Sequence, residues 1–263
     1  MKKVLALLFA VMMIAVLFTS CEVADTLVVG YTIYAPMNYE DDNGNLVGFD
    51  TELAQAVGEK IGYTVNFQLI EWKQRYTELN SGNIDCIWNG FTANTADDDG
   101  FARSEKVDFS YNYMRNKQVI VTTSDIAATV VDNTSLAGKI GAVEAKSAGD
   151  SFLTDELVDA VKNGVASQLT AMRELVLGTA DFVVVDDQLA RAYVGTGDYK
   201  DLVIVETVEG TEEFYAIGFK KDSELTAKVN KALEELAADG TIAALAEKYG
   251  VSNTAITDFS NQK

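Results

Sequence analysis

Arg103 is the residue whose type and position first suggest a binding chemistry. It opens the stretch RSEKVDFS, directly after a segment that contains Asp97, Asp98 and Asp99. A guanidinium group keeps its charge at any physiological pH and offers planar pairs of donors that match a carboxylate. The chain has 40 acidic and 21 basic residues, so partners for an arginine are abundant. The residues alone leave two interpretations: Arg103 forms a surface ion pair with the acidic segment, or it holds an anionic ligand.

The absence of histidine removes several other chemistries. The 263 residues include none, so serine–histidine pairs, cysteine–histidine pairs and imidazole metal sites are excluded. The formal net charge is −19, without a basic run after residue 3, which argues against nucleic-acid binding. Two acidic segments have the composition of calcium loops, but alignment on Gly44 or Gly100 places Tyr39 or Thr95 first, where a carboxylate is needed. We therefore expect no metal, no cofactor and no nucleic-acid partner.

The N-terminus has the pattern of an export signal. MKK is followed by the apolar residues 4–18 and then by TSC, which is typical of a secretory signal peptide. The run is shorter than the ~20 residues of a membrane-spanning helix. LFTSCE resembles the bacterial lipobox, with Phe18 in place of the usual leucine. We expect a signal peptide over 1–20, a lipid on Cys21 and a tether over 21–26, which would anchor an exported protein to a bacterial membrane. The alternative is an ordinary signal peptide.

The second cysteine has no expected partner. Only Cys21 and Cys86 exist, so lipidation of the first leaves no disulfide to form. Cys86 lies in the apolar run IDCIW. The pattern predicts a buried, inert thiol.

Strands and helices alternate in the first third of the chain, which predicts a parallel α/β sheet. Apolar side chains recur every four positions in residues 50–62, which predicts a helix that Asp50 or Thr51 caps and Gly62 ends. Asn43-Gly44 predicts a hairpin turn. Binding sites in such sheets lie at the carboxyl ends of strands, here near YTIYAP, EW and WNGFT. The other expected elements are strands at 26–32, 63–70 and 84–91 and a helix at 73–82.

A second set of elements predicts a second α/β lobe, followed by a helical C-terminus. No long linker separates the two sets, so we expect strands to join the lobes. The expected strands lie at 118–123, 139–145, 180–187 and 202–208, and the expected helices at 147–164, 167–178, 223–240 and 241–250.

Six stretches in order resemble the extracytoplasmic solute-binding proteins of polar amino-acid ABC importers. They include EWKQRYTELNSGNIDCIWNGFT, RSEKVDFSYNYM, LAGKIGAVEAKSAGDSFL and GTADFVVVDDQLARAYV, and together they cover nearly all of residues 27–250. The resemblance implies a two-lobed α/β periplasmic-binding-protein fold, with two Rossmann-like lobes joined by two hinge strands. Its lobes would be 27–121 plus 216–263 and 122–215, with hinge strands at Val119–Thr123 and Phe214–Gly218.

The same resemblance implies partners for both charges of a free amino acid. Arg103, four residues before VDFS, takes the place of the family's carboxylate-binding arginine, and Ser147 and Ala148 open a helix whose N–H groups favour anions. Asp186, at the end of FVVVD, takes the place of the amine-binding acid, and the alternative is a strand-end acid that lies in solvent or caps a helix. Tyr34 and Trp72 would cover the rest of the ligand, and Asn89 faces either the cleft or the lobe interior. The expected ligand-binding residues are Tyr34, Trp72, Asn89, Gly90, Thr92, Arg103, Ser147, Ala148 and Asp186.

The chain departs from the family pattern in several places. The connection 93–102 is longer and more acidic than the family's, and we interpret it as a solvated loop. Lys146 either adds positive charge to the site or points into water. Tyr31 stands where binders of cationic amino acids often carry an acid, which argues against arginine or lysine as the ligand. Side-chain specificity could come from Glu71, Glu144 and Gln188.

The function implied is capture of an amino acid by lobe closure and its delivery to the permease subunits of an ABC importer. Such a protein is a monomer that touches the membrane only through its lipid, and it is not an enzyme. The alternatives are two non-transport members of the same fold, a ligand sensor subunit and a cyclohexadienyl-dehydratase-like enzyme. The enzyme would need a general acid or base in the cleft, for which Glu71 or Glu144 could serve.

Overall fold

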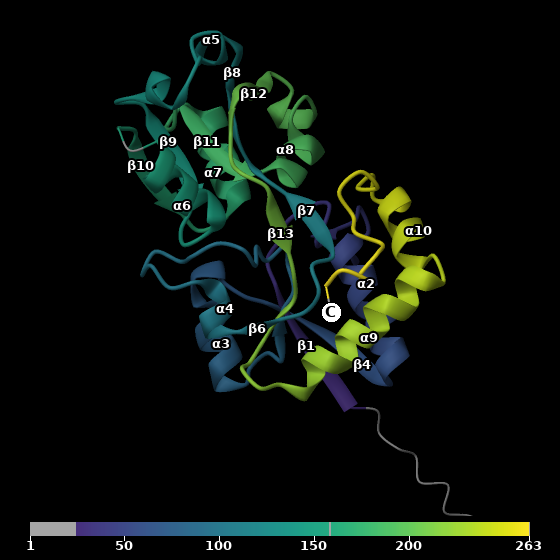
Figure 1. The fold of residues 1–263 in the computed structure, drawn as a ribbon. Helices are drawn as coiled ribbons and strands as arrows, with labels where there is room; N and C mark the ends of the chain where they lie inside the picture. Colours follow the sequence, from purple (N-terminus) through teal and green to yellow (C-terminus); the bar gives the residue numbers. More distant parts are fainter. Residues whose placement is uncertain (1–24, 158, 263) are drawn as a thin grey trace, which may run out of the picture.

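The computed structural model describes residues 25–157 and 159–262. The predicted signal peptide and the predicted lipid site at Cys21 lie outside the described residues. Within the described ranges, no helix combines the length and apolar character that a membrane span requires. Two lobes are visible in Figure 1, one below with both the first strands and the last helices of the chain, and one above with the middle of the chain.

Lobe 1 is built on a five-stranded sheet in the order β4-β1-β5-β14-β6. Strand β1 is parallel to β4 and β5, and β14 is antiparallel to β5 and β6. The strands are β1 (Asp25–Tyr31), β4 (Tyr63–Leu69), β5 (Cys86–Ile87), β6 (Asp108–Phe109), β14 (Gly218–Phe219) and the hairpin β2 (Tyr39–Glu40) and β3 (Leu46–Val47). The helices are α2 (Phe49–Ile61), η1 (Trp72–Gln74), α3 (Arg75–Ser81), α4 (Arg103–Lys106), α9 (Glu224–Ala238) and α10 (Thr241–Lys248).

Helix α2 ends as predicted and begins differently. Gly62 has φ 78 and its N–H bonds to the carbonyl of Gly58, a left-handed end that favours glycine. The predicted cap at Asp50 or Thr51 is wrong, because both are buried inside the helix and Gly48 precedes it. Gly48 has φ 130, and a Cβ there would lie 2.1 Å from the carbonyl oxygen of Met37. Glycine therefore permits the close approach that starts the helix.

Lobe 2 holds a second five-stranded sheet in the order β10-β9-β11-β8-β12. The strands are β8 (Gln118–Thr123), β9 (Ile140–Glu144), β10 (Val161–Val165), β11 (Phe182–Asp186) and β12 (Leu202–Glu209). The helices are α5 (Ser124–Ala127), η2 (Asn133–Leu136), α6 (Ala148–Glu156), α7 (Gln168–Leu177), α8 (Asp187–Tyr193) and η3 (Gly197–Tyr199).

The helix predicted over 147–164 is too long. Helix α6 ends at Glu156, and Val161–Val165 form the edge strand β10, which pairs in parallel with Ile140–Glu144 of β9. Its polar sequence VKNGV carries no strand signal of its own. The ladder to β9 supplies backbone hydrogen bonds that local sequence does not predict.

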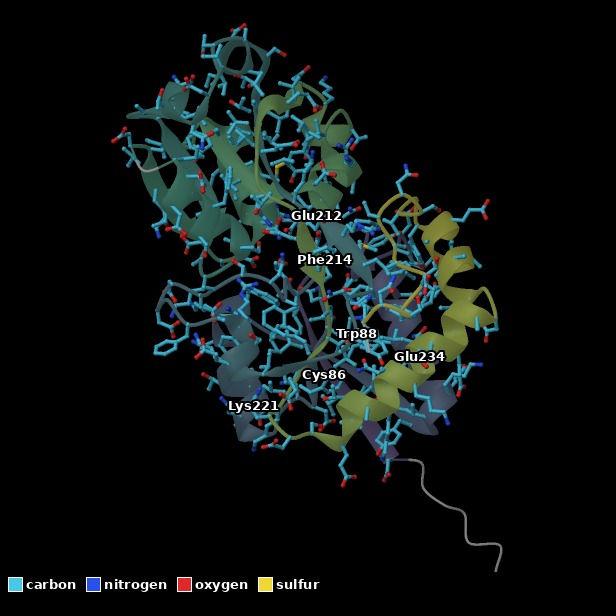
Figure 2. The ribbon with its side chains drawn as sticks, viewed as in Figure 1. Cys86, Trp88, Glu212, Phe214, Lys221 and Glu234 are labelled. Atoms are coloured by element: carbon cyan, nitrogen blue, oxygen red, sulfur yellow. The ribbon has the colours of Figure 1, made fainter. Side chains whose placement is uncertain are left out.

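Strands β7 (Met114–Asn116) and β13 (Glu213–Tyr215) pair antiparallel and run between the lobes (Figure 1). The predicted first hinge strand, Val119–Thr123, is wrong, because β8 lies inside the lobe 2 sheet between β11 and β12. The second hinge strand was expected at Phe214–Gly218, and its first residue, Phe214, does lie in β13. Figure 2 shows Glu212 and Phe214 at this crossing.

The apolar run around Cys86 lies in the interior of lobe 1 (Figure 2). Cys86 is a buried free cysteine, and burial raises the pKa of its thiol, so the predicted burial is confirmed. Trp88 is fully buried beside Tyr113, which makes it a packing residue. The hairpin predicted at Asn43-Gly44 joins β2 to β3, and Gly44 has φ 78.

Candidate functional site

A single cleft brings together all nine predicted ligand-binding residues. Lobe 1 and lobe 2 each contribute to its walls, and β7 and β13 pass between them. Its lining consists of Thr32, Tyr34, Trp72, Asn89, Gly90, Thr92, Arg103, Glu144, Ser147, Ala148, Gln168 and Asp186.

The lobe 1 wall follows the carboxyl ends of β1 and β5. Asn89 lies on the cleft, yet its amide bonds inward to the side chain of Asn38 at 2.7 Å and the carbonyl of Thr32 at 2.9 Å. Gly90 has φ 60, and a Cβ there would approach the Tyr34 ring to 2.7 Å. A side chain at this position would therefore collide with the aromatic wall.

Trp72 starts the short helix η1 after β4 and is almost fully buried. The guanidinium of Arg75 lies 4.9 Å from the centroid of its ring, and the ring meets Phe91 edge-on. Tyr34 is fixed by a 2.7 Å hydrogen bond between its hydroxyl and that of Tyr215 on β13. The two rings are thus held by neighbours of their own and line the cleft as rigid surfaces.

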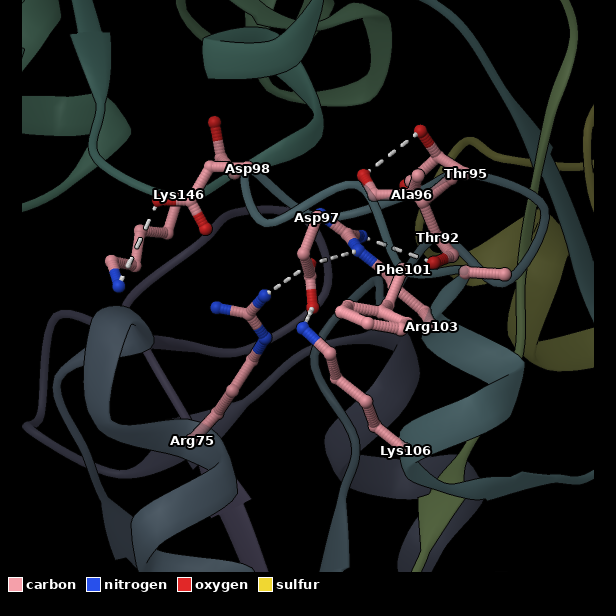
Figure 3. A network of polar contacts seen from close by, with 12 residues as sticks. Arg75, Thr92, Thr95, Ala96, Asp97, Asp98, Phe101, Arg103, Lys106 and Lys146 are labelled. Atoms are coloured by element: carbon pink, nitrogen blue, oxygen red, sulfur yellow. Dashed lines mark hydrogen bonds and ion pairs between the residues drawn. The ribbon is translucent and has the colours of Figure 1, made fainter.

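Arg103 is 1% exposed and uses two of its three nitrogens within the protein. Nε donates to Asp97 Oδ1 at 2.9 Å, and Nη1 donates to the carbonyl oxygen of Thr92 at 3.0 Å (Figure 3). Among the described residues, Nη2 has no acceptor. Burial and the charge of Arg75 lower the pKa of Arg103, but an arginine remains charged. The cleft therefore contains a buried cation with an unused donor group.

The expectation of a solvated acidic loop is wrong for Asp97. Its side chain is 2% exposed and contacts three cations: Arg75 at 2.7 Å, Arg103 at 2.9 Å and Lys106 at 2.8 Å (Figure 3). Burial by itself would raise the pKa of Asp97, but the Lys106 hydrogen bond and the two guanidinium charges outweigh it and lower the pKa to about 2. Asp98, in contrast, is 57% exposed.

The surface ion pair, one of the two initial interpretations of Arg103, does not describe this arrangement. Its ion pair with Asp97 lies in the interior, not on the surface. The ion pair orients the guanidinium through Nε, and Nη2 is left without an acceptor among the described residues. The acidic loop therefore positions the arginine at the cleft instead of neutralising it in solvent.

The lobe 2 wall begins at the N-terminus of α6. Ser147 caps the helix by accepting from the N–H of Asp150 at 3.1 Å. Ala148 is the first helical residue, so its N–H belongs to the turn whose donors lack partners within the helix. The two residues bring a partial positive charge to the cleft.

Asp186 ends β11 and is held by amide side chains. Asn116 and Gln118 donate to its Oδ1 at 2.7 Å and 2.6 Å, and Gln168 donates to its Oδ2. The same two amides of Asn116 and Gln118 also donate to Glu213 Oε2, at 2.8 Å and 2.9 Å. The carboxyl groups of Asp186 and Glu213 are therefore neighbours that share donors.

The cleft favours protonation of its acids. Burial and the charge of Asp186 raise the pKa of Glu144 to about 8 and that of Glu213 to about 7. Burial also raises the pKa of Asp186, against the opposing effect of the three amide donors. A positively charged group placed among these acids would lower their pKa values again.

Several side chains that sequence analysis weighed lie elsewhere. Glu71 is 65% exposed beside Lys73, and Gln188 lines a different cavity near the β7 end. Lys146 is half exposed and lies 3.8 Å from Asp98, outside the cleft lining. Glu144, also considered, does line the cleft.

Two lining residues, Thr32 and Gln168, were not among the predicted ligand-binding residues. Thr32 follows β1, so its position at a strand end was a usable signal. Gln168 is the first residue of α7 and reaches Asp186 across 18 positions of sequence. Its role depends on packing between α7 and β11, which no local pattern reveals.

Comparison with known proteins gives consistent matches over both lobes. The model of the bacterial extracellular solute-binding proteins, family 3, matches residues 27–252. The chain is 28% identical over 226 residues to the arginine-binding extracellular protein ArtP of Bacillus subtilis (strain 168), covering 82% of each. It is 28% identical over 219 residues to the L-cystine-binding protein TcyA of the same organism, covering 82% of this chain and 77% of that protein.

The fold is similar to that of solved binding proteins. An ancestral arginine-binding protein bound to arginine superposes with a TM-score of 0.77 and 33% identity, over 85% of this chain and 97% of that chain. This similarity confirms the predicted two-lobed α/β fold. The matched region contains every residue that lines the cleft.

Proposed function

Because the chain belongs to the bacterial extracellular solute-binding proteins of family 3, we propose that it binds a free amino acid in the cleft between its lobes. The observation that carries the proposal is the pairing of Arg103 on lobe 1 with Asp186 on lobe 2 in one cleft. A zwitterion taken out of water needs an opposite charge and hydrogen bonds at each end. In this cleft, Arg103 provides the opposite charge for a carboxylate and Asp186 provides it for an ammonium group.

The ligand carboxylate is assigned to Arg103 and to the start of α6. The unused Nη2 of Arg103 donates to one carboxylate oxygen. Ser147 and the N–H of Ala148 face the same anion from lobe 2. The ligand thereby links the two lobes, which favours their closure around it.

The ligand ammonium is assigned to Asp186. Its three amide donors fix the carboxylate in place before the ligand arrives, so little ordering is required on binding. The carbonyl of Gly90 and the hydroxyl of Thr92 are further acceptors on the opposite wall, and Asn89 holds that wall in position. Tyr34 and Trp72 cover the remainder of the ligand.

Binding requires the lobes to move. The free volume of the cleft is about 20 Å³, which is enough for about one water molecule. An amino acid is several times larger, so it enters when the lobes separate and remains when they close. The paired strands β7 and β13 are the connection about which such a hinge motion occurs.

The biological role proposed is delivery of the captured amino acid to the permease subunits of an ABC importer. The relatives ArtP and TcyA are binding proteins by name, and this chain is likewise a binding protein and not an enzyme. Lobe closure would present a shape to the permease that the open protein lacks. The monomeric state and the lobe boundary at residues 215/216 are part of this proposal, whereas a boundary at 121/122 would divide β8, which lies in the lobe 2 sheet.

Amino-acid binding is tested by a thermal-shift screen of the protein from residue 22 onward against the twenty amino acids. A ligand that binds only the folded state stabilises it by about 2.7 kcal/mol when present at about 100 times its Kd. We expect at least one amino acid to raise the melting temperature, with D-enantiomers as controls. If none does so at millimolar concentration, the proposed function is wrong.

The lipid anchor is proposed separately, on the lipobox-like sequence before Cys21. The expected result is incorporation of labelled fatty acid into the protein in a bacterial host and loss of label in the variant Cys21→Ser. Cys86→Ala is the matched control, because Cys86 is buried in lobe 1, and it should keep the label. Label retained by Cys21→Ser would refute the anchor.

A further inference from the structure

Glu144 is a buried carboxylate that lines the cleft and has no hydrogen-bonding partner among the described residues. It ends β9, next to β11, which ends in Asp186, and the two parallel strands are in register from Phe182↔Gly141 to Val184↔Val143. The residue is 5% exposed and lines the cleft. Across the described part of the chain, no side chain or backbone N–H bonds to the Glu144 carboxylate and no cation pairs with it.

Asp186, on the neighbouring strand β11, differs from Glu144 in its hydrogen bonds. The Asp186 carboxylate accepts three amide hydrogen bonds from the protein, whereas the Glu144 carboxylate accepts none from the described residues. An ionised carboxylate without hydrogen bonds or an opposite charge is strongly unfavourable in a buried position. A site that keeps such a group is suited to a ligand that supplies the missing donors.

The charge balance indicates what kind of donor fits. Glu144 and Asp186 line the cleft, and Glu213 adjoins it. Among the described lining residues the cation is Arg103, whose charge is partly offset by Asp97. A neutral zwitterion adds one charge of each sign, so the carboxylate of Glu144 still lacks an opposite charge. A ligand with one more positive group would supply that charge.

We propose that Glu144 determines specificity by binding the cationic side chain of a basic amino acid. The inference rests on the proposed function and adds the substrate class: an α-amino acid with a side-chain guanidinium or ammonium group. Trp72 and Tyr34 line the same cleft, and aromatic faces attract a cation by roughly 0.5–2 kcal/mol. Tyr31 does not line the cleft in this structure.

The protonation of Glu144 provides an independent readout. Burial and Asp186 raise its pKa to about 8, and Arg75 opposes them. The other charged groups at the cleft are Arg103 and, beside Asp186, Glu213. At pH 7 the group is largely protonated, and a bound cation stabilises its ionised form. Binding of a basic amino acid should therefore release a proton that binding of a neutral one does not.

The experiment compares arginine with citrulline, which has the same shape and an uncharged urea group. Titration calorimetry at pH 7 in two buffers of different ionisation enthalpy gives both affinity and proton release. We expect arginine to bind at least ~10-fold more tightly than citrulline, since hydrogen bonds to charged groups contribute roughly 1.5–3 kcal/mol. Lysine against norleucine repeats the comparison with an ammonium group.

The variant Glu144→Gln keeps the size of the side chain and removes its charge. It should bind arginine and citrulline within about threefold of each other and lose the extra proton release. Its melting temperature should not fall, because no described residue pairs with the carboxylate. Glu206→Gln is the matched control, an exposed glutamate of β12 in the same lobe, and it should keep the preference of the native protein.

The possible failures are distinguishable. If the native protein prefers a neutral amino acid, or binds citrulline as tightly as arginine, the role of Glu144 is refuted and the proposed function stands. If Glu144→Gln retains the full preference for arginine, another residue binds the side chain and the inference is wrong. If no amino acid binds the native protein, the proposed function itself fails.

Discussion

The variant Arg103→Met is expected to weaken amino-acid binding by at least ~100-fold, or about 3 kcal/mol. Arg103 is the buried guanidinium at the cleft, and Nη2 is its donor group without a described acceptor. Methionine fills a similar volume and donates no hydrogen bond. The ligand carboxylate would then be buried with only the α6 N-terminus to stabilise it. Titration calorimetry with the best ligand from the screen measures the loss.

A control separates binding from stability. Arg173→Met replaces an exposed arginine on α7 and should leave the affinity unchanged. In Arg103→Met, Asp97 keeps its contacts with Arg75 and Lys106, so the protein should still fold and show a melting transition. A folded Arg103→Met variant that binds within about threefold of the native protein would show that the carboxylate lies elsewhere.

The variant Asp97→Asn is expected to destabilise the protein by about 3–5 kcal/mol. Asp97 Oδ1 accepts from two buried guanidinium groups, Arg75 at 2.7 Å and Arg103 at 2.9 Å. An asparagine leaves these two like charges close together without a counter-ion. For a protein of this size, the loss corresponds to a melting temperature lower by roughly 10 °C. Asp98→Asn is the matched control, because Asp98 is the exposed neighbour, and it should change stability little.

The contribution of Asp97 also has a defined pH dependence. Its pKa in the folded state is lowered to about 2, below the value of about 3.9 expected in an unfolded chain. The stabilisation is therefore complete above about pH 4 and is lost as the pH falls toward 2. Denaturant titrations of the native protein and Asp97→Asn should converge over that interval. A constant difference down to pH 2 would contradict the assignment.

These two predictions are coupled through one side chain. Asp97 orients Arg103 through Nε, so Asp97→Asn should also reduce ligand affinity, though less than Arg103→Met does. Asp98→Asn tests whether the charge of the loop itself matters. The loop is thus a structural part of the anion site, although its sequence resembles a solvated connection.

Much of the site could be predicted from local sequence. The carboxyl ends of β1 and β5, the cap at Ser147 and the terminal acid of β11 each follow from short patterns of apolar and polar residues. Strand ends and helix starts are local features, and parallel sheets gather them on one edge. The particular residues were chosen by resemblance to the family, and all nine of them line one cleft.

Most of the elements, the family resemblance and nine of the cleft-lining residues follow from the sequence, because periodicity, helix caps, strand ends and motifs are features of neighbouring residues. The burial and pairing of each charged group depend on the folded structure. Asp97 is buried because Arg75, 22 positions away, meets it, and Glu144 is unpaired because the amides that bond to Asp186 do not reach it. The hinge at β7 and β13 and the edge strand β10 likewise depend on distant partners. The burial and pairing of a charged side chain depend on contacts between remote segments, and these contacts form only when the chain folds.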